Sequence, residues 1–277
     1  MSHTVDMATA TTSSGMVIEP LTIMGFASID VFHAFVWGHI VFGSVGLVAF
    51  WVPVVGKKGG PLHRNFGKVF TVTMLLTGGF ATLISLTTLY DPAGTHPHLM
   101  SHPDFGDEVT IRAIFGWLMI YLAVLTLNLT WYGWLCVMHK RDRAANRTPL
   151  NLASQAILLV ASINCAYHGV VDLQPLMMGI STIGFATVGT NLWYLYKPNV
   201  DPKDWIRELL KGLVGTGISV YTAFFAFGAV RLLPEAALTP ALWSVPLVVG
   251  LSIIFYQWYK LRPRRTVGRA GPPAPAE

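Results

Sequence analysis

Histidine is the residue type in this 277-residue chain that is best suited to chemistry. There are nine histidines, and no Lys, Arg, Asp or Glu stands in the middle of any long apolar run. Imidazole can ligate haem iron or zinc, and it can exchange protons near neutral pH. The lack of a mid-run carboxylate or lysine argues against an ion-coupled transporter with a midplane carboxylate and against a retinal pigment.

Four histidines could hold haem b in two pairs, one pair near each face of a membrane. His39 with His168 would form the outer pair, and His63 with His139 the inner pair. A haem near each face is what an electron path across a bilayer requires. The first interpretation is therefore a b-type haem or quinone-linked electron-transfer protein.

A second interpretation uses outer histidines and aspartates as ligands of zinc or another divalent ion. His33, His168, Asp91 and Asp172 would supply imidazole and carboxylate ligands, and an open coordination position would activate water for a membrane-embedded hydrolase. His168 and Asp172 are four residues apart and share a helix face, so the carboxylate can orient the imidazole.

A third interpretation assigns these residues structural roles. His63 and His139 stand beside Lys and Arg and would meet lipid phosphates at the inner surface. His39 and Asn128 would form hydrogen bonds between helices. The protein would then be a non-catalytic assembly or scaffold subunit in contact with other membrane subunits. The sequence leaves the three interpretations open.

Seven apolar runs must position these residues, and each is about 18–27 residues long, enough to cross a hydrocarbon layer of ~30 Å as a helix. Backbone polar groups in lipid must be satisfied within their own segment, which favours helices. The predicted fold is therefore an all-α, polytopic membrane helix bundle. The runs are Val31–Val55, Val69–Leu89, Ile111–Val137, Leu150–Val171, Pro175–Tyr196, Leu209–Leu233 and Ala241–Trp258.

Basic residues occupy every second gap between these runs. All Lys and Arg residues except Arg112 and Arg231 follow the first, third, fifth or seventh run. Because basic residues stay in the cytoplasm during insertion, the N-terminus is predicted to lie outside and the C-terminus inside.

The composition is that of one membrane domain. At 53% hydrophobic and 12% charged residues, the chain is unlike an ordinary soluble domain. We predict an extracytoplasmic tail and surface segment at 1–30, a seven-span membrane domain at 31–262 and a disordered cytoplasmic tail at 263–277. The net charge of +5 comes mainly from the inside-positive bias, so the predicted partner is the lipid bilayer and not a nucleic acid. Cys136 and Cys165 are predicted to be small core residues.

A short motif precedes and enters the second run. Residues 61–68 read Pro-Leu-His-Arg-Asn-Phe-Gly-Lys, and His39 stands in the preceding run. This pattern resembles a family of uncharacterised bacterial membrane proteins, a domain of unknown function with a Leu-His-Arg-x-x-Gly-Lys/Arg signature. Residues 204–224 resemble a second region of related proteins, where a histidine is expected at the position of Leu209. The resemblance implies a multi-pass protein of the bacterial inner membrane, and a cofactor site that used that histidine would be incomplete here.

Overall fold

The computed structural model describes residues 20–101, 106–228 and 240–261, and every element in these ranges is helical. The all-α prediction is therefore confirmed for the described residues. The long helices are α1 (Pro20–Val55), α2 (Pro61–Tyr90), α5 (Met119–His139), α6 (Pro149–Val171), α7 (Pro175–Tyr196), α8 (Asp204–Ala223) and α10 (Pro240–Leu261). The short elements are α3 (Pro92–Thr95), η1 (Pro97–Leu99), α4 (Glu108–Ile111), the π-helical η2 (Arg112–Leu118), η3 (Ala144–Asn146) and the π-helical η4 (Phe224–Gly228).

The helices coincide with the apolar runs wherever the structure describes them. Helix α1 begins at Pro20, so residues 20–30 continue the first long helix. The predicted run Leu209–Leu233 is helical as far as Gly228, and residues 229–233 lie outside the described part. Residues 1–19 of the predicted N-terminal tail and the predicted tail at 263–277 also lie outside it.

Proline marks the beginning of most helices. Its fixed φ suits the first helical turn, where its missing N–H would have no intrahelical partner. Thr148 adds an N-cap to α6 by accepting a hydrogen bond from the Asn151 N–H at 3.2 Å. The prolines at the first position are Pro20, Pro61, Pro92, Pro97, Pro149, Pro175 and Pro240.

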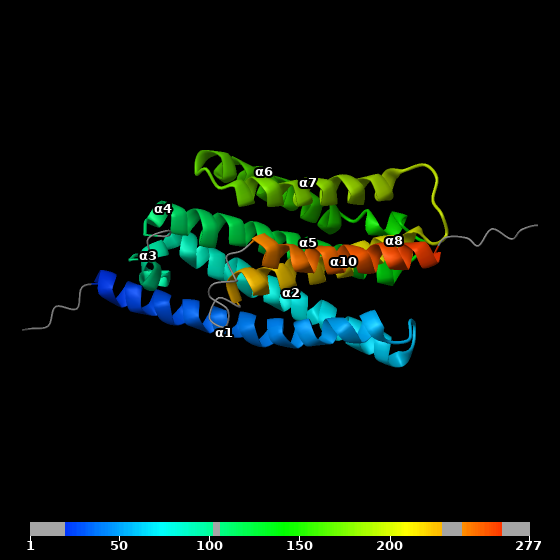
Figure 1. Cartoon of the computed structure of the whole chain (residues 1–277), viewed down its shortest axis with the longest axis horizontal. Helices are drawn as coiled ribbons and strands as arrows, with labels where there is room; N and C mark the ends of the chain where they lie inside the picture. Colours follow the sequence, from blue (N-terminus) through cyan, green and yellow to red (C-terminus); the bar gives the residue numbers. More distant parts are fainter. Residues whose placement is uncertain (1–19, 102–105, 229–239, 262–277) are drawn as a thin grey trace, which may run out of the picture.

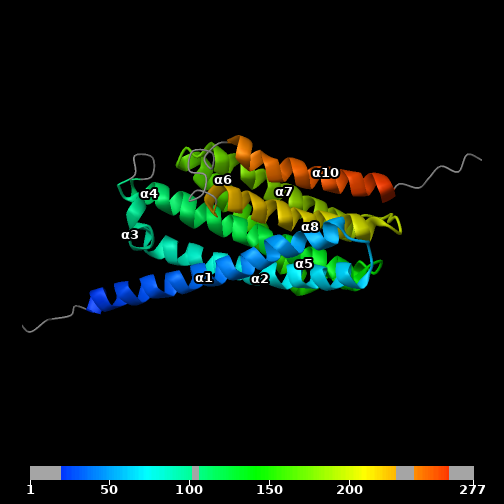
Figure 2. The same ribbon diagram turned by 60° about the horizontal axis from the view of Figure 1, so that its bottom comes forward.

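The long helices run side by side in an elongated bundle with α5 near its centre (Figure 1). Helix α5 packs against α2, α6 and α8, while α1 covers α2, α7 covers α6 and α10 covers α8. Two views of the bundle place α1 and α6 on opposite sides of it (Figures 1 and 2). Histidines on these two helices are therefore separated by the α2 and α5 layer.

The basic connections gather at one end of the bundle. The turn after α1, the α5–α6 and α7–α8 connections and the C-terminal end of α10 lie at the same end in Figure 1. The opposite end holds α3, α4 and the α6–α7 turn. We call these the basic end and the α3 end. The basic gaps of the sequence thus converge in space.

Among the residues that the structure describes, four helices are long and apolar enough to cross a membrane. They are Asp30–Val55 of α1, Pro61–Tyr90, the continuous α4–η2–α5 helix Glu108–His139, and Pro149–Val171. Their outer faces carry large apolar side chains, such as Trp37 at 66% exposed and Val48 at 72%. Exposed apolar surface of this kind suits lipid and not water.

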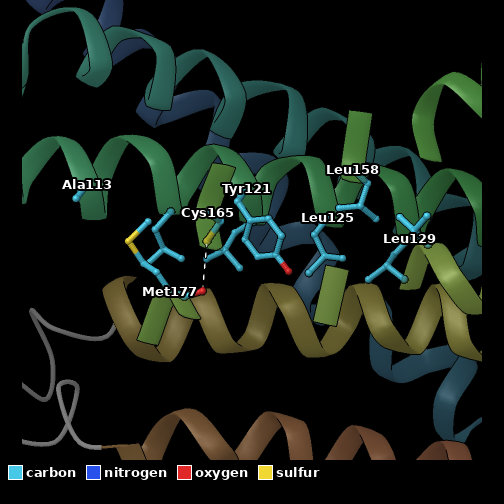
Figure 3. Packing of buried hydrophobic residues seen from close by; sticks show 10 residues of the cluster. Ala113, Tyr121, Leu125, Leu129, Leu158, Cys165 and Met177 are labelled. Atoms are coloured by element: carbon cyan, nitrogen blue, oxygen red, sulfur yellow. Dashed lines mark hydrogen bonds between the residues drawn. The ribbon is translucent and has the colours of Figure 1, made fainter. Parts of the chain in front are cut away.

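An apolar core fills the space between α5, α6 and α7. Figure 3 shows Tyr121, Leu125 and Leu129 of α5 pointing toward Leu158 and Cys165 of α6, all at most 5% exposed. Cys136 is likewise fully buried, and neither cysteine is in a disulfide. The prediction that both cysteines are core residues is confirmed.

Buried amides also join these three helices. Asn128 Nδ2 donates to Ser154 Oγ at 2.8 Å, and Asn191 Nδ2 lies 3.4 Å from Asn128 Oδ1 and 3.1 Å from Gln155 Oε1. All but Ser154 are at most 2% exposed. Such hydrogen bonds hold helices together where the hydrophobic drive is weak. The role predicted for Asn128 is confirmed.

Glycine allows α5 and α8 to approach closely. A Cβ atom at Gly212 would lie 2.7 Å from the Gly133 Cα, which is too short for any side chain. The two backbones are therefore in direct contact, as small residues permit in membrane helix pairs.

Candidate functional site

The clearest pairing of reactive side chains is His168 with Asp172 at the C-terminal end of α6. Asp172 caps the helix, and its backbone N–H donates to the His168 carbonyl at 2.9 Å. The His168 Nδ1–H donates to Asp172 Oδ2 at 3.0 Å. The side chains are 20% and 15% exposed, so the pair is mostly buried but reachable. The predicted shared helix face is confirmed.

Aromatic rings hold the His168 imidazole on two sides. The Trp117 indole stacks on it with centroids 5.0 Å apart and planes inclined by 15°. Tyr167 meets it edge-on at 5.3 Å. Trp117 comes from η2, a π-helical stretch that inserts an extra residue into a turn and is frequent at functional sites.

A cleft of about 250 Å³ opens beside this pair. Glu108 and Arg112 stand on its other wall, joined by an exposed ion pair of 3.8 Å, and Val109 and Ala113 add apolar surface. The cleft thus offers one imidazole, two carboxylates and one guanidinium around a partly apolar space.

This arrangement can accept a hydrogen bond, and then a proton, from the hydroxyl of a ligand. Because Nδ1 donates to Asp172, the neutral imidazole keeps Nε2 as an acceptor. The Asp172 carboxylate would stabilise the imidazolium formed when Nε2 takes up a proton. Stacking on Trp117 fixes the plane in which that exchange occurs.

The other three histidines predicted as haem ligands donate Nδ1–H to carbonyl or amide oxygens of the protein. His39 bonds the Thr77 carbonyl of α2 at 3.1 Å, and His63 bonds the Pro53 carbonyl at 3.1 Å. His139 bonds Asn146 Oδ1 at 2.5 Å. Each bond orients an imidazole at a helix contact.

The predicted outer haem pair is not brought together. His39 lies on α1 and His168 on α6, and these helices occupy opposite sides of the bundle (Figures 1 and 2). His63 and His139 both belong to the basic end, but each is held by its own partner.

Of the four predicted metal ligands, the structure pairs His168 with Asp172. The Asp91 carboxylate caps α3 by accepting from the Gly94 N–H at 2.8 Å. The His33 ring packs edge-on against Phe32. Within the described ranges, no group of three His, Cys, Asp or Glu side chains is arranged to hold a metal ion.

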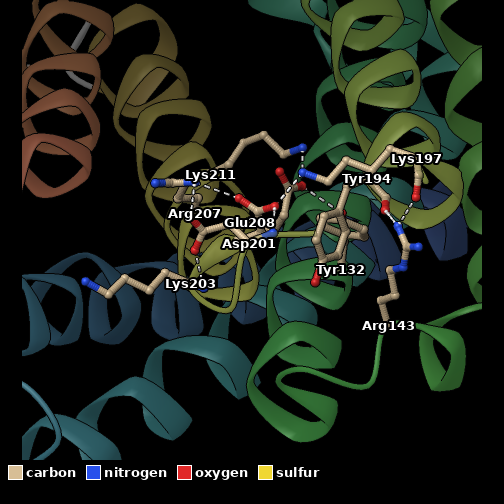
Figure 4. Close-up of polar contacts among 10 residues, drawn as sticks. Tyr132, Arg143, Tyr194, Lys197, Asp201, Lys203, Arg207, Glu208 and Lys211 are labelled. Carbon is tan, nitrogen blue, oxygen red and sulfur yellow. Dashed lines mark hydrogen bonds and ion pairs between the residues drawn. The ribbon is translucent and has the colours of Figure 1, made fainter. Parts of the chain in front are cut away.

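A second polar cluster lies at the basic end, where α8 begins (Figure 4). The Glu208 carboxylate accepts from the Tyr132 hydroxyl at 2.7 Å and pairs with Lys211 at 2.5 Å. Asp204 pairs with Lys197 and Arg207 at 2.5 and 2.7 Å. These carboxylates neutralise the bases around them, so the cluster ties α8 to α5 and to the α7 end.

The sequence analysis did not identify the Trp117 indole that stacks on His168. It also did not identify the polar cluster at the start of α8, which we call the Glu208 cluster. Arg112 was the available signal for the first, because it is one of only two basic residues outside the basic gaps. Glu208 and Lys211 are three residues apart on one helix, which is the available signal for the second.

The chain matches no protein-family model, no curated protein and no solved structure. The similarity to bacterial membrane proteins suggested by residues 61–68 stays a prediction.

Proposed function

We propose that the chain is a seven-span protein of the bacterial inner membrane, with its basic end in the cytoplasm and its N-terminus outside. Four helices that meet the length and apolarity of a membrane span support this, as does the gathering of basic connections at one end. Helices α7 and α10 have 22 residues each, about 33 Å at the helical rise, and run beside those four.

On this basis we infer that the His168–Asp172 cleft binds the hydroxylated headgroup of a quinol, in a quinone-linked electron-transfer protein. The observation that carries the proposal is the oriented His168 imidazole, stacked on Trp117 beside the cleft. Nε2 would accept a hydrogen bond from a quinol hydroxyl, and Arg112 would donate to the second ring oxygen. The apolar atoms of Val109 and Ala113 suit the ring itself.

The geometry supports a quinol site better than haem or zinc. Haem with two histidine ligands needs facing imidazoles, whereas His39 and His168 stand on opposite sides of the bundle. A structural zinc site takes four ligands and a catalytic one three, and the described residues provide a pair at this point. A quinol needs only the acceptor and donor that the cleft contains.

The test is a binding titration on detergent-purified protein with a short-chain ubiquinol or menaquinol analogue. His168→Ala should weaken binding at least tenfold, because it removes the acceptor that orients the ring. His98→Ala is the matched control, since His98 is an exposed histidine on η1, outside the cleft. Equal binding by wild type and His168→Ala would refute the proposal.

The same preparation separates the alternatives. A Soret band that shifts on dithionite reduction and weakens in His39→Ala would indicate haem b. Stoichiometric zinc, lost in Asp172→Ala, would indicate the metal-dependent hydrolase. A colourless, metal-free protein that binds no quinol would leave the scaffold role.

A further inference from the structure

Two basic side chains converge on one carbonyl where α1 ends. Lys58 Nζ donates to the Pro53 and Val54 carbonyls at 2.6 Å each, and His63 Nδ1–H donates to the same Pro53 oxygen at 3.1 Å. An ammonium has three donors, so one donor of Lys58 is left for another acceptor.

A third basic group, Lys260 of α10, adds to this charge. Partial burial first, and then the positive charge of Lys260, lower the pKa of Lys58. Lys260 itself lies over the Tyr256 ring at 4.4 Å. Within the described residues, neither Lys58 nor Lys260 forms an ion pair with a carboxylate.

The carboxylates near the start of α8 already pair with other basic residues, so they do not balance the charges of Lys58 and Lys260. Asp201 and Asp204 pair with Arg207, and Glu208 pairs with Lys211. Lys58 follows the end of α1 and Lys260 lies in the last turn of α10, and both helices pack on α8. An external anion at this end would meet both lysine charges, which no described carboxylate pairs with.

An apolar groove of about 190 Å³ lies between α1 and α10 with α8 as its floor. Figure 2 shows α8 running between the other two helices. Trp51 lines the α1 side, Ile218 the floor, and Val249 and Ile253 the α10 side.

The two polar groups of this groove satisfy each other. Trp51 Nε1–H donates to the Tyr221 hydroxyl at 2.6 Å, and that hydroxyl donates to the Leu47 carbonyl at 2.8 Å. The remaining surface is hydrocarbon, which favours an acyl chain over a polar ligand.

The distance between the groove and Lys260 allows a single amphiphilic molecule to occupy both. Lys260 follows Ile253 by seven residues of α10, which is about 10 Å along the axis. A phosphate at the lysines therefore lies about two helical turns from the hydrocarbon surface, as in a phospholipid whose chain enters the groove.

We propose that Lys58 and Lys260 bind the phosphate of one anionic phospholipid, whose acyl chain lies in the α1–α8–α10 groove. This rests on the proposed membrane-spanning arrangement and not on quinol binding. The lipid would also fill the gap between α1 and α10, which both pack on α8.

The test measures lipid retention by native mass spectrometry and melting temperature in detergent. Dioleoylphosphatidylglycerol is titrated against dioleoylphosphatidylcholine and against glycerol 3-phosphate, which has the phosphate but no chains. Wild type should retain one phosphatidylglycerol and melt at a higher temperature with it. The choline lipid should act weakly, and glycerol 3-phosphate should have no effect.

Two variants test the two halves of the site. Lys58→Gln/Lys260→Gln should weaken phosphatidylglycerol binding roughly thirty-fold, because each cation near a membrane surface contributes roughly fivefold. The exposed pair Lys140→Gln/Arg141→Gln removes the same charge at the same end and should leave binding within threefold. Val249→Trp fills the groove and should also lose the retained lipid.

Several results would overturn the proposal. They are unchanged binding in the Lys58/Lys260 variant, an equal loss in the Lys140/Arg141 control, full retention by Val249→Trp, or an effect of glycerol 3-phosphate equal to that of the lipid. Quinol titration of the Lys58/Lys260 variant should match wild type, so failure of the lipid site is distinguishable from failure of the cleft.

Discussion

The His168 imidazole lies nearly parallel to the Trp117 indole, 5.0 Å away, while Asp172 holds its Nδ1–H at 3.0 Å. Three side chains from two packed helices thus fix both the plane and the tautomer of one ring. A histidine constrained in this way presents Nε2 in one direction, which lowers the entropy lost when a ligand hydroxyl binds.

Asp172→Asn should therefore weaken quinol binding about tenfold, at the low end of the roughly 10–100-fold losses that follow removal of a partner orienting a metal-binding histidine. The amide cannot stabilise an imidazolium, and it can rotate to offer its NH₂ group to the ring. Binding titrations on the purified variant measure this effect. Asp107→Asn is the matched control at the same end, because asparagine can keep the cap that Asp107 provides to the Thr110 N–H. A control that loses as much affinity as Asp172→Asn would contradict the role of Asp172.

Glu208 should contribute more to stability than Glu108, the other glutamate in an ion pair among the described residues. It is 15% exposed and bonds both Lys211 and Tyr132, whereas Glu108 and its partner Arg112 are 55% and 45% exposed. Glu208→Gln leaves Lys211 without its anion and should lower the unfolding free energy by about 2–4 kcal/mol. Tyr132→Phe removes one hydrogen bond to a charge and should cost about 1–2 kcal/mol.

Glu108→Gln is the control, and its effect should be below about 0.5 kcal/mol because its ion pair is exposed. Melting curves in one detergent compare the three variants. Equal shifts in melting temperature for Glu208→Gln and Glu108→Gln would contradict the role of Glu208 in joining α8 to α5.

The helices and some local contacts could be predicted from the sequence. Apolar run length and proline position locate the helices, since both act within a segment. The His168–Asp172 bond was predictable because residues four apart meet on one helix. The role of Asn128 was predictable from the cost of burying an unpaired amide.

Contacts between helices could not be predicted in the same way. Whether His39 faces His168 depends on which helices are neighbours, and a single sequence does not contain that order. Trp117 escaped prediction for a second reason. The π-helical turn at η2 changes the side-chain register of the third run, so a count of 3.6 residues per turn misplaces the side chains beyond that turn.

The proposed orientation predicts which cysteine substitutions a membrane-impermeant maleimide can reach in intact cells. Lys57→Cys and Asn199→Cys lie in exposed connections of the basic end and should react only after the membrane is opened. His98→Cys, at the α3 end, should react in intact cells because position 98 is exposed. The native cysteines are buried and should give little background. Labelling of positions 57 and 199 from opposite sides would contradict the seven-span arrangement.

His96 should make the stability of the α3 end depend on pH. Burial first, and then the nearby charge of His98, lower the pKa of His96 from 6.5 to about 4. Its ring packs 4.7 Å from Phe115 and 5.7 Å from Phe32, so the neutral form is the one that fits. The unfolded chain binds this proton more readily, so the contribution is complete above pH 6.5 and is lost as the pH falls toward 4.

Acidification from pH 7 to 4.5 should thus cost wild type about 1–2 kcal/mol more than it costs His96→Phe, after allowance for partial exposure of the ring. Phenylalanine keeps the aromatic packing and cannot take up the proton. Melting curves at both pH values measure the difference. His98→Phe serves as a partial control, because removing the neighbouring charge leaves the larger burial effect on His96 in place. A wild type and a His96→Phe variant that lose equal stability on acidification would contradict this assignment, and the acid sensitivity would then belong to other groups.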